Sequence, residues 1–351
     1  MVTIQEKLQF INNEINPRLN AFLDHKLKEA KKLHPQAGIL VEEVKRFINL
    51  GGKRVRPAFV YAGYLSVGGK KETIFDLACS VELLHTWALI HDDIIDRSLT
   101  RRGEKTSHIY WKDQFRVLGL KGDKDHFGIS TAILAGDLAY SLADSVFDQY
   151  NSSEEVRKYW EAVKFEVMHG EYLDVLFSFK DTALEADIRS VLEYKTAKYT
   201  VQRPLQIGAS FGRATSEQIK TLEAYGSRVG QVFQIQDDIQ GIFGEEKKLG
   251  KSVSSDLIEG KKTLLIFSAQ KRASVGEAKV LVKVLGNPQA TEKEIQDARD
   301  VIKKVGALEE SQKLVDQLSL EAIKEVEKST LTTEGKEWLI QASDYLKSLA
   351  H

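Results

Sequence analysis

Apolar residues recur at every third or fourth position along much of the chain, which is the spacing of residues on one face of an α-helix. Two runs show this spacing clearly, one through Leu77, Val81, Leu84, Ala88 and Ile95, the other through Leu222, Tyr225, Val229, Val232 and Ile235. Alternating apolar and polar residues bounded by Asn-Gly or Asp-Gly turns, the pattern of β-hairpins, are lacking. The pattern therefore predicts an all-α fold.

Glycines, prolines and polar clusters mark the expected loops. The chain has 5 prolines and none between Pro57 and Pro204, which permits long helices there. Breaks are expected at 51–52, 68–69, 119–128, 151–153 and 244–260, and none of them is long enough to be a linker. Near the C-terminus, amphipathic Lys/Glu-rich helices such as 292–305 and 311–328 are expected to form a solvated outer face.

Composition excludes several classes of protein. With 50 Lys and Arg against 51 Asp and Glu in 351 residues, the chain has no global positive field to hold a nucleic acid or an anionic membrane. A single cysteine, Cys79, cannot form an internal disulfide, and the N-terminus does not resemble a signal peptide. No run of about 18 uninterrupted apolar residues predicts a membrane span. We expect a cytoplasmic protein.

The first motif that could bind a ligand or take part in catalysis is acidic. Asp92 and Asp96 lie four residues apart, so on a helix they share one face with Cβ atoms about 6 Å apart. Oxygen ligands of this kind favour Mg²⁺, which keeps waters and shares its coordination with substrate phosphates. Asp93 would serve as a neighbouring or water-mediated ligand. Arg101 and Arg102 follow closely and suit phosphate binding. An exposed acidic helix end is the alternative interpretation.

A second acidic motif, Gln234, Asp237 and Asp238, also follows an apolar helical run. Two buried acidic helix ends are costly without cations between them. The sequence GGKRVRP at residues 51–57 places three cations at an expected helix start, which favours an anion. Further candidate phosphate cations are Lys195 beside Thr196, Lys198, Lys251, Lys261 and Lys262. The set predicts one metal-bridged diphosphate and a second diphosphate held by Lys and Arg.

Four motifs in this order resemble one known family: GGKRVRP, DDIIDRSLTRRG, the Lys195-Thr196 pair, and FQIQDDIQG followed by GKSVSSDLIEGKKTLL. They are similar to the motifs of the trans-prenyltransferases, the short-chain polyprenyl diphosphate synthases. The resemblance implies a single isoprenoid synthase domain over residues 1–351, a helical bundle around a deep apolar cavity, and a homodimer. It also implies that isopentenyl diphosphate condenses with an allylic diphosphate.

The resemblance implies roles residue by residue. Three Mg²⁺ ions would bind the allylic diphosphate, two at Asp92 and Asp96 and one at Asp237. The same diphosphate would contact Arg101, Lys195 and Lys251, and a further basic residue close to the allylic site would be Lys261. Isopentenyl diphosphate would be gripped by Lys53, Arg56, His85 and Arg102. Carbonyl or amide dipoles near the developing cation would come from Thr196 and Gln234.

The implied mechanism is ionisation, condensation and elimination. The allylic carbon loses diphosphate, the double bond of isopentenyl diphosphate attacks the cation in a water-free cavity, and a proton leaves to the released diphosphate. Two positions depart from the commoner family pattern. Gly241 stands where a third Asp is usual, which would weaken the third metal site modestly, and Glu171 stands where Gln is usual, which requires a cation or a proton nearby.

Product length in this family depends on what closes the cavity below the first acidic motif. Trp87 precedes Asp92 by five residues, about 7 Å along a helix, so its indole can form the floor. Its neighbour Ala88 is small, and the motif lacks the insertion of the common bacterial farnesyl type. This combination resembles archaeal-type geranylgeranyl synthases and favours a C20 product over C15. If Trp87 is only core packing, the next barrier is Leu84.

Several alternatives stay open. The product can be C15, or the enzyme can be a bifunctional C15/C20 synthase. A terpene cyclase or a head-to-head coupling enzyme shares the architecture but does not need the isopentenyl site, so Lys53 and Arg56 argue against it. A non-catalytic regulatory subunit would be expected to lose acidic or basic ligands, and both sets are present.

Overall fold

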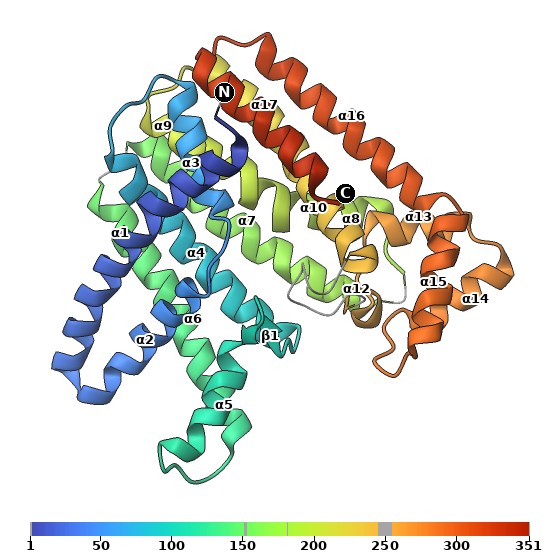
Figure 1. The fold of residues 1–351 in the computed structure, drawn as a ribbon, viewed down its shortest axis with the longest axis horizontal. Coiled ribbons are helices and arrows are strands. Elements are labelled where there is room, and N and C mark those ends of the chain that lie inside the picture. The colour runs from blue at the N-terminus through green and yellow to red at the C-terminus, as the bar shows by residue number, and fades with distance from the viewer. Residues whose placement is uncertain (1, 151–152, 181, 245–254, 351) are drawn as a thin grey trace. The chain divides into compact units, whose positions relative to one another are not determined.

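The computed structural model describes residues 2–150, 153–180, 182–244 and 255–350. Within these ranges nearly every element is a helix (Figure 1), which confirms the predicted all-α class. The contacts divide the chain into two compact units. Unit 1 consists of Met1–Tyr61 and Lys71–Ser152, and unit 2 consists of Ala62–Lys70 and Ser153–His351. The single domain over residues 1–351 stays a prediction.

Unit 1 holds the N-terminal helices and a small hairpin. Its elements are α1 (Ile4–Leu33), η1 (Pro35–Ala37), α2 (Gly38–Asn49), α4 (Thr73–Ile95), β1 (Thr100–Arg101), β2 (Glu104–Lys105), α5 (Ser107–Val117) and α6 (Lys124–Gln149). The helix α3 (Val55–Ser66) begins in unit 1, and its last residues belong to unit 2.

Unit 2 holds the remaining helices. They are α7 (Glu154–Ser178), α8 (Glu185–Val191), η2 (Leu192–Gln202), α9 (Arg203–Phe211), α10 (Ser216–Phe243), α12 (Ser255–Glu259), α13 (Leu264–Arg272), α14 (Val275–Val284), α15 (Glu292–Lys304), α16 (Ala307–Glu327), α17 (Thr333–Lys347) and η3 (Ser348–Ala350).

The helix α4 is the central helix of unit 1, where it packs along α6. Of its predicted apolar run, Leu77, Val81 and Leu84 are buried, and Ala88 is half-buried. Ile95 is exposed because it is the last residue of the helix, where the chain turns away. Within the described residues α4 is the one helix long and apolar enough to cross a membrane, and 67% of its most apolar window is buried, as in the core helix of a soluble protein.

The helix α10 holds the second acidic motif in unit 2. A capping box at Thr215 and Gln218 begins it, which satisfies free N–H groups at its start. Its predicted apolar run from Leu222 to Ile235 is buried, as expected. It packs against η2, α9, α16 and α17.

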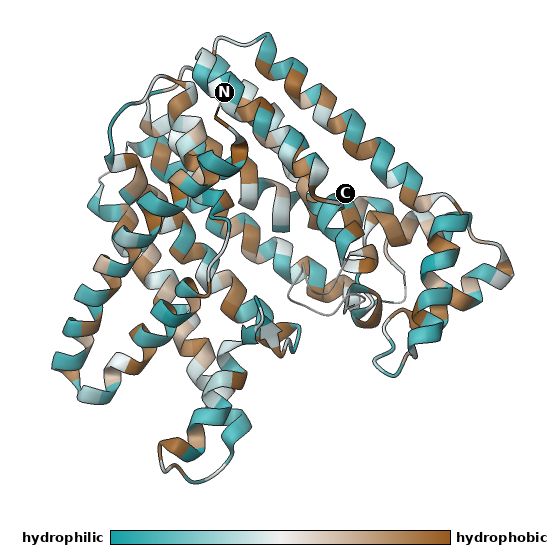
Figure 2. Cartoon of the chain, in the orientation of Figure 1, coloured by the Kyte–Doolittle hydropathy of each residue, from teal (hydrophilic) through white to brown (hydrophobic). Residues whose placement is uncertain are grey.

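The predicted C-terminal amphipathic helices are present as α15 and α16. Teal and brown alternate along α16 in Figure 2, as expected of a helix with one face on the core and one in water. The inner face of α15 consists of Ile295, Ala298, Val301 and Ile302.

A two-stranded antiparallel hairpin follows α4 and was not predicted from the sequence. β1 pairs with β2, and the two turn residues between them, Arg102 and Gly103, have φ angles of 55° and 79°. Two successive positive φ values are the geometry of the turn that best fits the twist of a hairpin. The basic pair Arg101-Arg102 therefore lies on a hairpin that folds back toward α4, and does not continue the helix.

Candidate functional site

The first acidic motif lies at the C-terminal end of α4, with Asp96 as its C-cap. The hairpin brings Arg101 onto it. Arg101 Nη2 lies 3.1 Å from Asp92 Oδ2, and Arg101 Nε donates to Asp93 Oδ1 at 2.8 Å. The structure thus places the guanidinium group against the carboxylates that the sequence predicts as metal ligands.

Asp92 and Asp93 differ strongly in environment. The Asp92 side chain is 22% exposed, whereas that of Asp93 is fully buried. Burial raises the pKa of Asp93 to about 6, although Arg101 opposes the shift. The Oδ2 atom of Asp93 is buried without a hydrogen-bond partner. Asp92 and the half-buried Asp96 are therefore better suited as direct ligands, with Asp93 behind them.

These carboxylates fit Mg²⁺ by their donor chemistry. Within the described ranges no group of three or more His, Cys, Asp and Glu side chains could hold a metal ion on its own. An ion at Asp92 and Asp96 would need water or substrate oxygens to complete its shell. Mg²⁺ usually binds in this way, through one or two carboxylates and substrate phosphates.

The loop before α3 meets the hairpin in unit 1. Arg102 Nη1 donates to the carbonyl oxygen of Gly51. A Cβ atom on Gly52 would lie 2.7 Å from Arg102 Nη2, and the φ angle of Gly52 is 135°, so only glycine fits there. Burial lowers the pKa of Arg102 to about 10, which leaves it charged at neutral pH.

The three cations of the GGKRVRP motif have different environments. Lys53 is exposed. Arg54 is buried, and its Nη1 lies 2.7 Å from Glu82 Oε1, so it serves the fold and not a ligand. Arg56 Nη1 lies 3.0 Å from His85 Nε2. Of the three cations at this helix start, Arg54 is therefore not available to an anion, and Lys53 and Arg56 stay the predicted ligands.

His85 acts as a neutral partner of Arg56. Desolvation, followed by the positive charges of Arg56, Arg102 and Arg101, lowers the pKa of His85 well below its usual value. A neutral imidazole has one ring nitrogen that accepts a hydrogen bond. Since Arg56 can only donate, Nε2 is the acceptor and orients the guanidinium group.

The candidate chain-length residues lie one to two turns before Asp92 on α4. Leu84 is fully buried, while Trp87 and Ala88 are half-buried. The Trp87 indole packs edge to face against Tyr140 of α6, with ring centroids 5.1 Å apart. The sequence alone did not identify Tyr140, because nothing in the local pattern links a residue of α6 to one of α4.

In unit 2, η2 carries Lys195 and Thr196. Lys195 Nζ lies 2.6 Å from Asp174 Oδ2 and 3.0 Å from Glu171 Oε2, both on α7. The unusual charge of Glu171 is therefore balanced by Lys195. Lys198, a candidate phosphate cation, instead lies 3.2 Å from Glu166 and 3.0 Å from Glu193.

A chain of hydrogen bonds joins η2 to the second acidic motif. Thr196 Oγ1 donates to Gln234 Oε1, and Gln234 Nε2 donates to Asp238 Oδ1 at 2.6 Å. Asp238 is buried, and burial, followed by the charge of Asp256, raises its pKa well above the usual value. Asp237 is exposed, so it is the member of the pair available to an ion.

The structure explains Gly241. A Cβ atom at this position would lie 2.0 Å from Asp256 Oδ2, so the buried Asp256 carboxylate occupies the space of a side chain. Lys261 Nζ lies 3.1 Å from Glu259 Oε2, close to the same segment. Lys251 lies outside the described residues.

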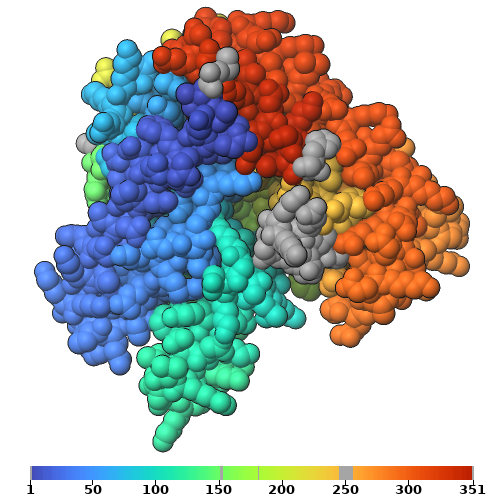
Figure 3. Space-filling model, in the orientation of Figure 1, coloured from blue at the N-terminus to red at the C-terminus, as the bar shows by residue number. Residues whose placement is uncertain are grey.

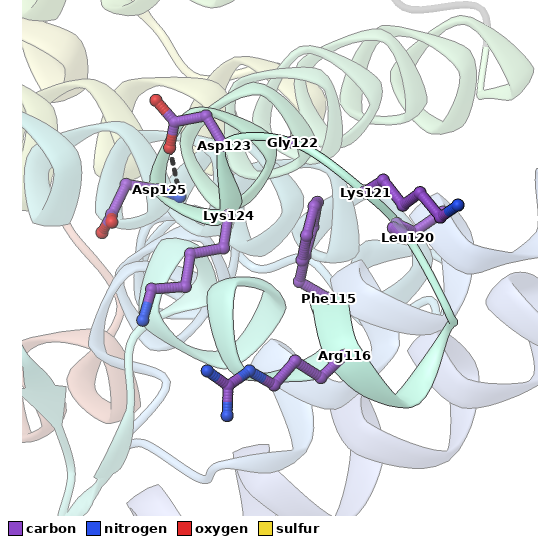
Figure 4. A pocket seen from close by; sticks show the side chains of 8 residues that line it. All are labelled: Phe115, Arg116, Leu120, Lys121, Gly122, Asp123, Lys124 and Asp125. Carbon is purple, nitrogen blue, oxygen red and sulfur yellow. Dashed lines mark hydrogen bonds between the residues drawn. The ribbon is translucent and has the colours of Figure 1, made fainter.

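The turn between α5 and α6 forms a shallow pocket of about 530 Å³ (Figure 4), but no predicted site residue lines it. Asp123 caps α6 there by accepting the N–H groups of Asp125 and His126. Figure 3 shows this green segment standing out from the neighbouring helices of unit 1. We interpret the pocket as a consequence of the turn.

Comparison with known proteins identifies the family. Residues 38–302 match the sequence model of the polyprenyl synthetases. The chain is 30% identical to the geranylgeranyl diphosphate synthase of Saccharolobus solfataricus over 333 residues, 92% of each chain. It is 33% identical to the short chain isoprenyl diphosphate synthase of Methanocaldococcus jannaschii over 262 residues, 74% of this chain and 75% of that one.

Comparison with solved structures agrees with the sequence matches. A geranylgeranyl pyrophosphate synthase from Corynebacterium glutamicum, crystallised with isoprenyl diphosphate and magnesium, matches with a TM-score of 0.92 at 31% identity, covering 99% of both chains. Relatives named for shorter and longer products, farnesyl and geranylfarnesyl diphosphate synthases, match the sequence as well. The chain therefore belongs to the polyprenyl synthetase family, which confirms the predicted prenyltransferase class and isoprenoid synthase fold.

Proposed function

We propose that the chain is a short-chain trans-prenyltransferase that condenses isopentenyl diphosphate with allylic diphosphates and makes the C20 product geranylgeranyl diphosphate. The observation that carries the proposal is the family match over residues 38–302, a range that includes every residue of the proposed site. The relatives named above as geranylgeranyl synthases support the C20 product.

In unit 1, Asp92 and Asp96 hold two Mg²⁺ ions and Arg101 contacts the allylic diphosphate. The support is the ion pair of Arg101 with Asp92, which keeps a guanidinium group beside the carboxylates. Isopentenyl diphosphate is bound by Lys53, Arg56, His85 and Arg102. The support is the contact of Arg56 Nη1 with His85 Nε2 at 3.0 Å, which orients the guanidinium group for a second diphosphate.

In unit 2, Asp237 holds a third Mg²⁺ ion, and Lys195, Lys251 and Lys261 bind the allylic diphosphate. Thr196 and Gln234 stabilise the developing allylic cation through their dipoles. The hydrogen bond between Thr196 and Gln234 supports this role, because it fixes both side chains relative to η2 and α10. Asp238 accepts from Gln234 and positions it.

These residues account for each step of the chemistry. Bound Mg²⁺ supplies positive charge to the leaving diphosphate. Arg101 in unit 1 and Lys195 in unit 2 each offer a cation to a diphosphate oxygen, and the allylic C–O bond breaks with its electron pair going to the departing diphosphate. Arg56 and Arg102 hold isopentenyl diphosphate so that its double bond attacks the allylic carbon and a C–C bond forms. The proton lost afterwards goes to the released diphosphate.

Product length is set by the Trp87 floor. The support is the indole held against Tyr140 beside the small Ala88, a combination that favours a chain longer than C15, and Leu84 is the next barrier if Trp87 is only core packing. A farnesyl or bifunctional C15/C20 synthase is the alternative, since a single large aromatic at this depth also suits a shorter chain.

The chain works as one domain in a cytoplasmic homodimer. Ile129, Ile133 and Leu134 are exposed along α6, which supports self-association, because such an apolar stripe on one helix favours a protein interface. The lone buried Cys79 is compatible with a reducing compartment.

The experiment is product chromatography after purified protein is incubated with Mg²⁺, radiolabelled isopentenyl diphosphate and one starter: dimethylallyl, geranyl or farnesyl diphosphate. We expect a C20 prenyl diphosphate from each starter. Accumulation of C15 would favour a farnesyl synthase. Conversion of a starter without isopentenyl incorporation would indicate a cyclase, and no incorporation at all would favour a regulatory subunit.

A further inference from the structure

The segment η2 is π-helical over the eleven residues Leu192–Gln202 and carries Lys195 and Thr196. π-Helical turns are rare and occur frequently at functional sites. Pro204 follows directly, in the first turn of α9. A proline has no N–H and its ring clashes with the carbonyl four residues earlier in a regular α-helix, so a wider turn before it relieves the clash.

Three glycines let the neighbouring helices approach the backbone of η2. A Cβ atom on Gly170 of α7 would lie 2.3 Å from the backbone nitrogen of Lys195. On α10, a Cβ atom on Gly230 would lie 2.4 Å from Cα of Ala197. One on Gly226 would lie 2.6 Å from Cα of Gln202. The wide segment is therefore held tightly between α7 and α10.

An ion-pair cluster ties Lys198 of η2 and Arg203, the first residue of α9, to α7. Arg203 donates to both carboxylate oxygens of Glu166, from Nε at 2.7 Å and from Nη2 at 2.6 Å. Lys198 Nζ donates to the same carboxylate at 3.2 Å. The Glu166 and Arg203 side chains are only 15% and 13% exposed, so the two-pronged contact is shielded from water.

Glu166 and Gly170 are four residues apart and lie on the same face of α7. The contact at Gly170 fixes the position of Lys195 along α7. The contact at Glu166 fixes the position of the residues one to two turns after Lys195. Together they determine the register of η2 along α7. That register sets whether Lys195 reaches Asp174 and whether Thr196 reaches Gln234.

We propose that Glu166 is a positioning residue for the allylic half of the site: through Arg203 and Lys198 it holds η2 in the register that presents Lys195 and Thr196 to the allylic substrate. The inference rests on the function proposed above and deepens it. Glu166 touches no substrate in this account, and its effect passes through η2.

The test compares Glu166→Gln, which keeps the shape and removes the charge, with Glu166→Ala and with the control Glu193→Gln. Glu193 also pairs with Lys198 from η2, but its side chain is 45% exposed and does not join η2 to α7. For each protein we measure KM for the allylic diphosphate, KM for isopentenyl diphosphate, kcat, the helical circular dichroism and the Tm.

We expect KM for the allylic diphosphate to rise on the order of tenfold in Glu166→Gln, and more in Glu166→Ala if it folds, because small displacements of binding groups are costly. KM for isopentenyl diphosphate stays within about twofold, since its proposed ligands lie in unit 1. Glu193→Gln behaves like wild type. The double variant Glu166→Gln with Arg203→Lys is no worse than the poorer single variant.

Equal changes in both KM values, or a loss of thermal stability with both KM values unchanged, would assign Glu166 a purely structural role and overturn the inference. Wild-type protein that forms no prenyl diphosphate would overturn the proposed function and this inference together. An active wild type whose Glu166→Gln variant shows no KM split would overturn the inference alone.

Discussion

The ammonium group of Lys195 lies 3.0 Å from the carboxylate of Glu171. Asp174 also contacts this ammonium group, at 2.6 Å, so one cation meets two carboxylates before a diphosphate binds. The extra carboxylate is the one that the sequence identifies as unusual for the family. If Lys195 binds the allylic diphosphate as proposed, Glu171 competes with that substrate for the same positive charge.

Glu171→Gln is therefore expected to lower KM for the allylic diphosphate by about twofold to fivefold, the effect of removing one partly exposed charge contact. Steady-state kinetics with varied allylic substrate measures it. The control is Glu185→Gln on α8, a residue that pairs with Arg189 and is 42% exposed. A raised KM in Glu171→Gln would mean that Glu171 supports Lys195.

Trp87→Ala is expected to lengthen the product beyond that of wild type, because the indole that packs against Tyr140 is the proposed floor of the cavity. Trp87→Phe keeps an aromatic ring there and serves as the matched control. Chromatography of the prenyl chains gives the distribution. Identical distributions for wild type and Trp87→Ala would show that Trp87 is core packing only.

Gly241→Ala is expected to destabilise the protein, with a fall in Tm of about 3 °C or more, since its Cβ would meet the Asp256 carboxylate at 2.0 Å. Gly276→Ala on α14 is the control, because a Cβ there meets nothing within 4 Å and alanine favours a helix. Equal Tm values for the two variants would contradict the steric account of Gly241.

In the absence of metal and substrate, Asp238→Asn is expected to be more stable than wild type, by a margin that grows as pH rises. Burial raises the pKa of Asp238 well above 3.8, so the folded state binds its proton more tightly than the unfolded state. The free energy of unfolding of wild type therefore decreases as pH rises through the interval between the two pKa values. Asparagine removes this loss.

Thermal unfolding of wild type and variant is compared between pH 4, near the ordinary pKa of an aspartate, and pH 8. The Tm of Asp238→Asn exceeds that of wild type by about 2 °C or more at the upper end, and the difference shrinks toward the lower end. A difference that is constant with pH would mean that Asp238 does not titrate in this interval.

Much of the fold follows from the sequence because helix formation here depends on local spacing. The apolar run from Leu222 to Ile235 is sufficient to predict α10 and its buried face. The hairpin at Thr100–Lys105 was missed since its strands have two residues each, too short for an alternating pattern. The π-helical form of η2 was missed as well, because Pro204 alone does not specify it and its close contacts with α7 and α10 come from distant parts of the sequence.

In the candidate site, too, some features follow from the local sequence and others depend on long-range contacts. The spacing of Asp92 and Asp96 and the order of the motifs are local signals, so the sequence alone selects these residues as candidates. Which cations face a ligand depends on long-range partners. Glu82 lies 28 residues from Arg54 and takes it out of the candidate set, and Tyr140 reaches Trp87 from another helix. No local pattern carries that information.

The proposed chemistry is Mg²⁺-assisted ionisation of an allylic diphosphate, with Asp92 on α4 and Asp237 on α10 as proposed metal ligands. Its most direct test is the Mg²⁺-dependent incorporation of radiolabelled isopentenyl diphosphate by Asp92→Ala and Asp237→Ala, with the surface variant Asp113→Asn as control. We expect a fall in turnover of about 10²-fold or more in both variants, with unchanged helical circular dichroism. Near wild-type turnover of Asp92→Ala with Mg²⁺ would contradict it.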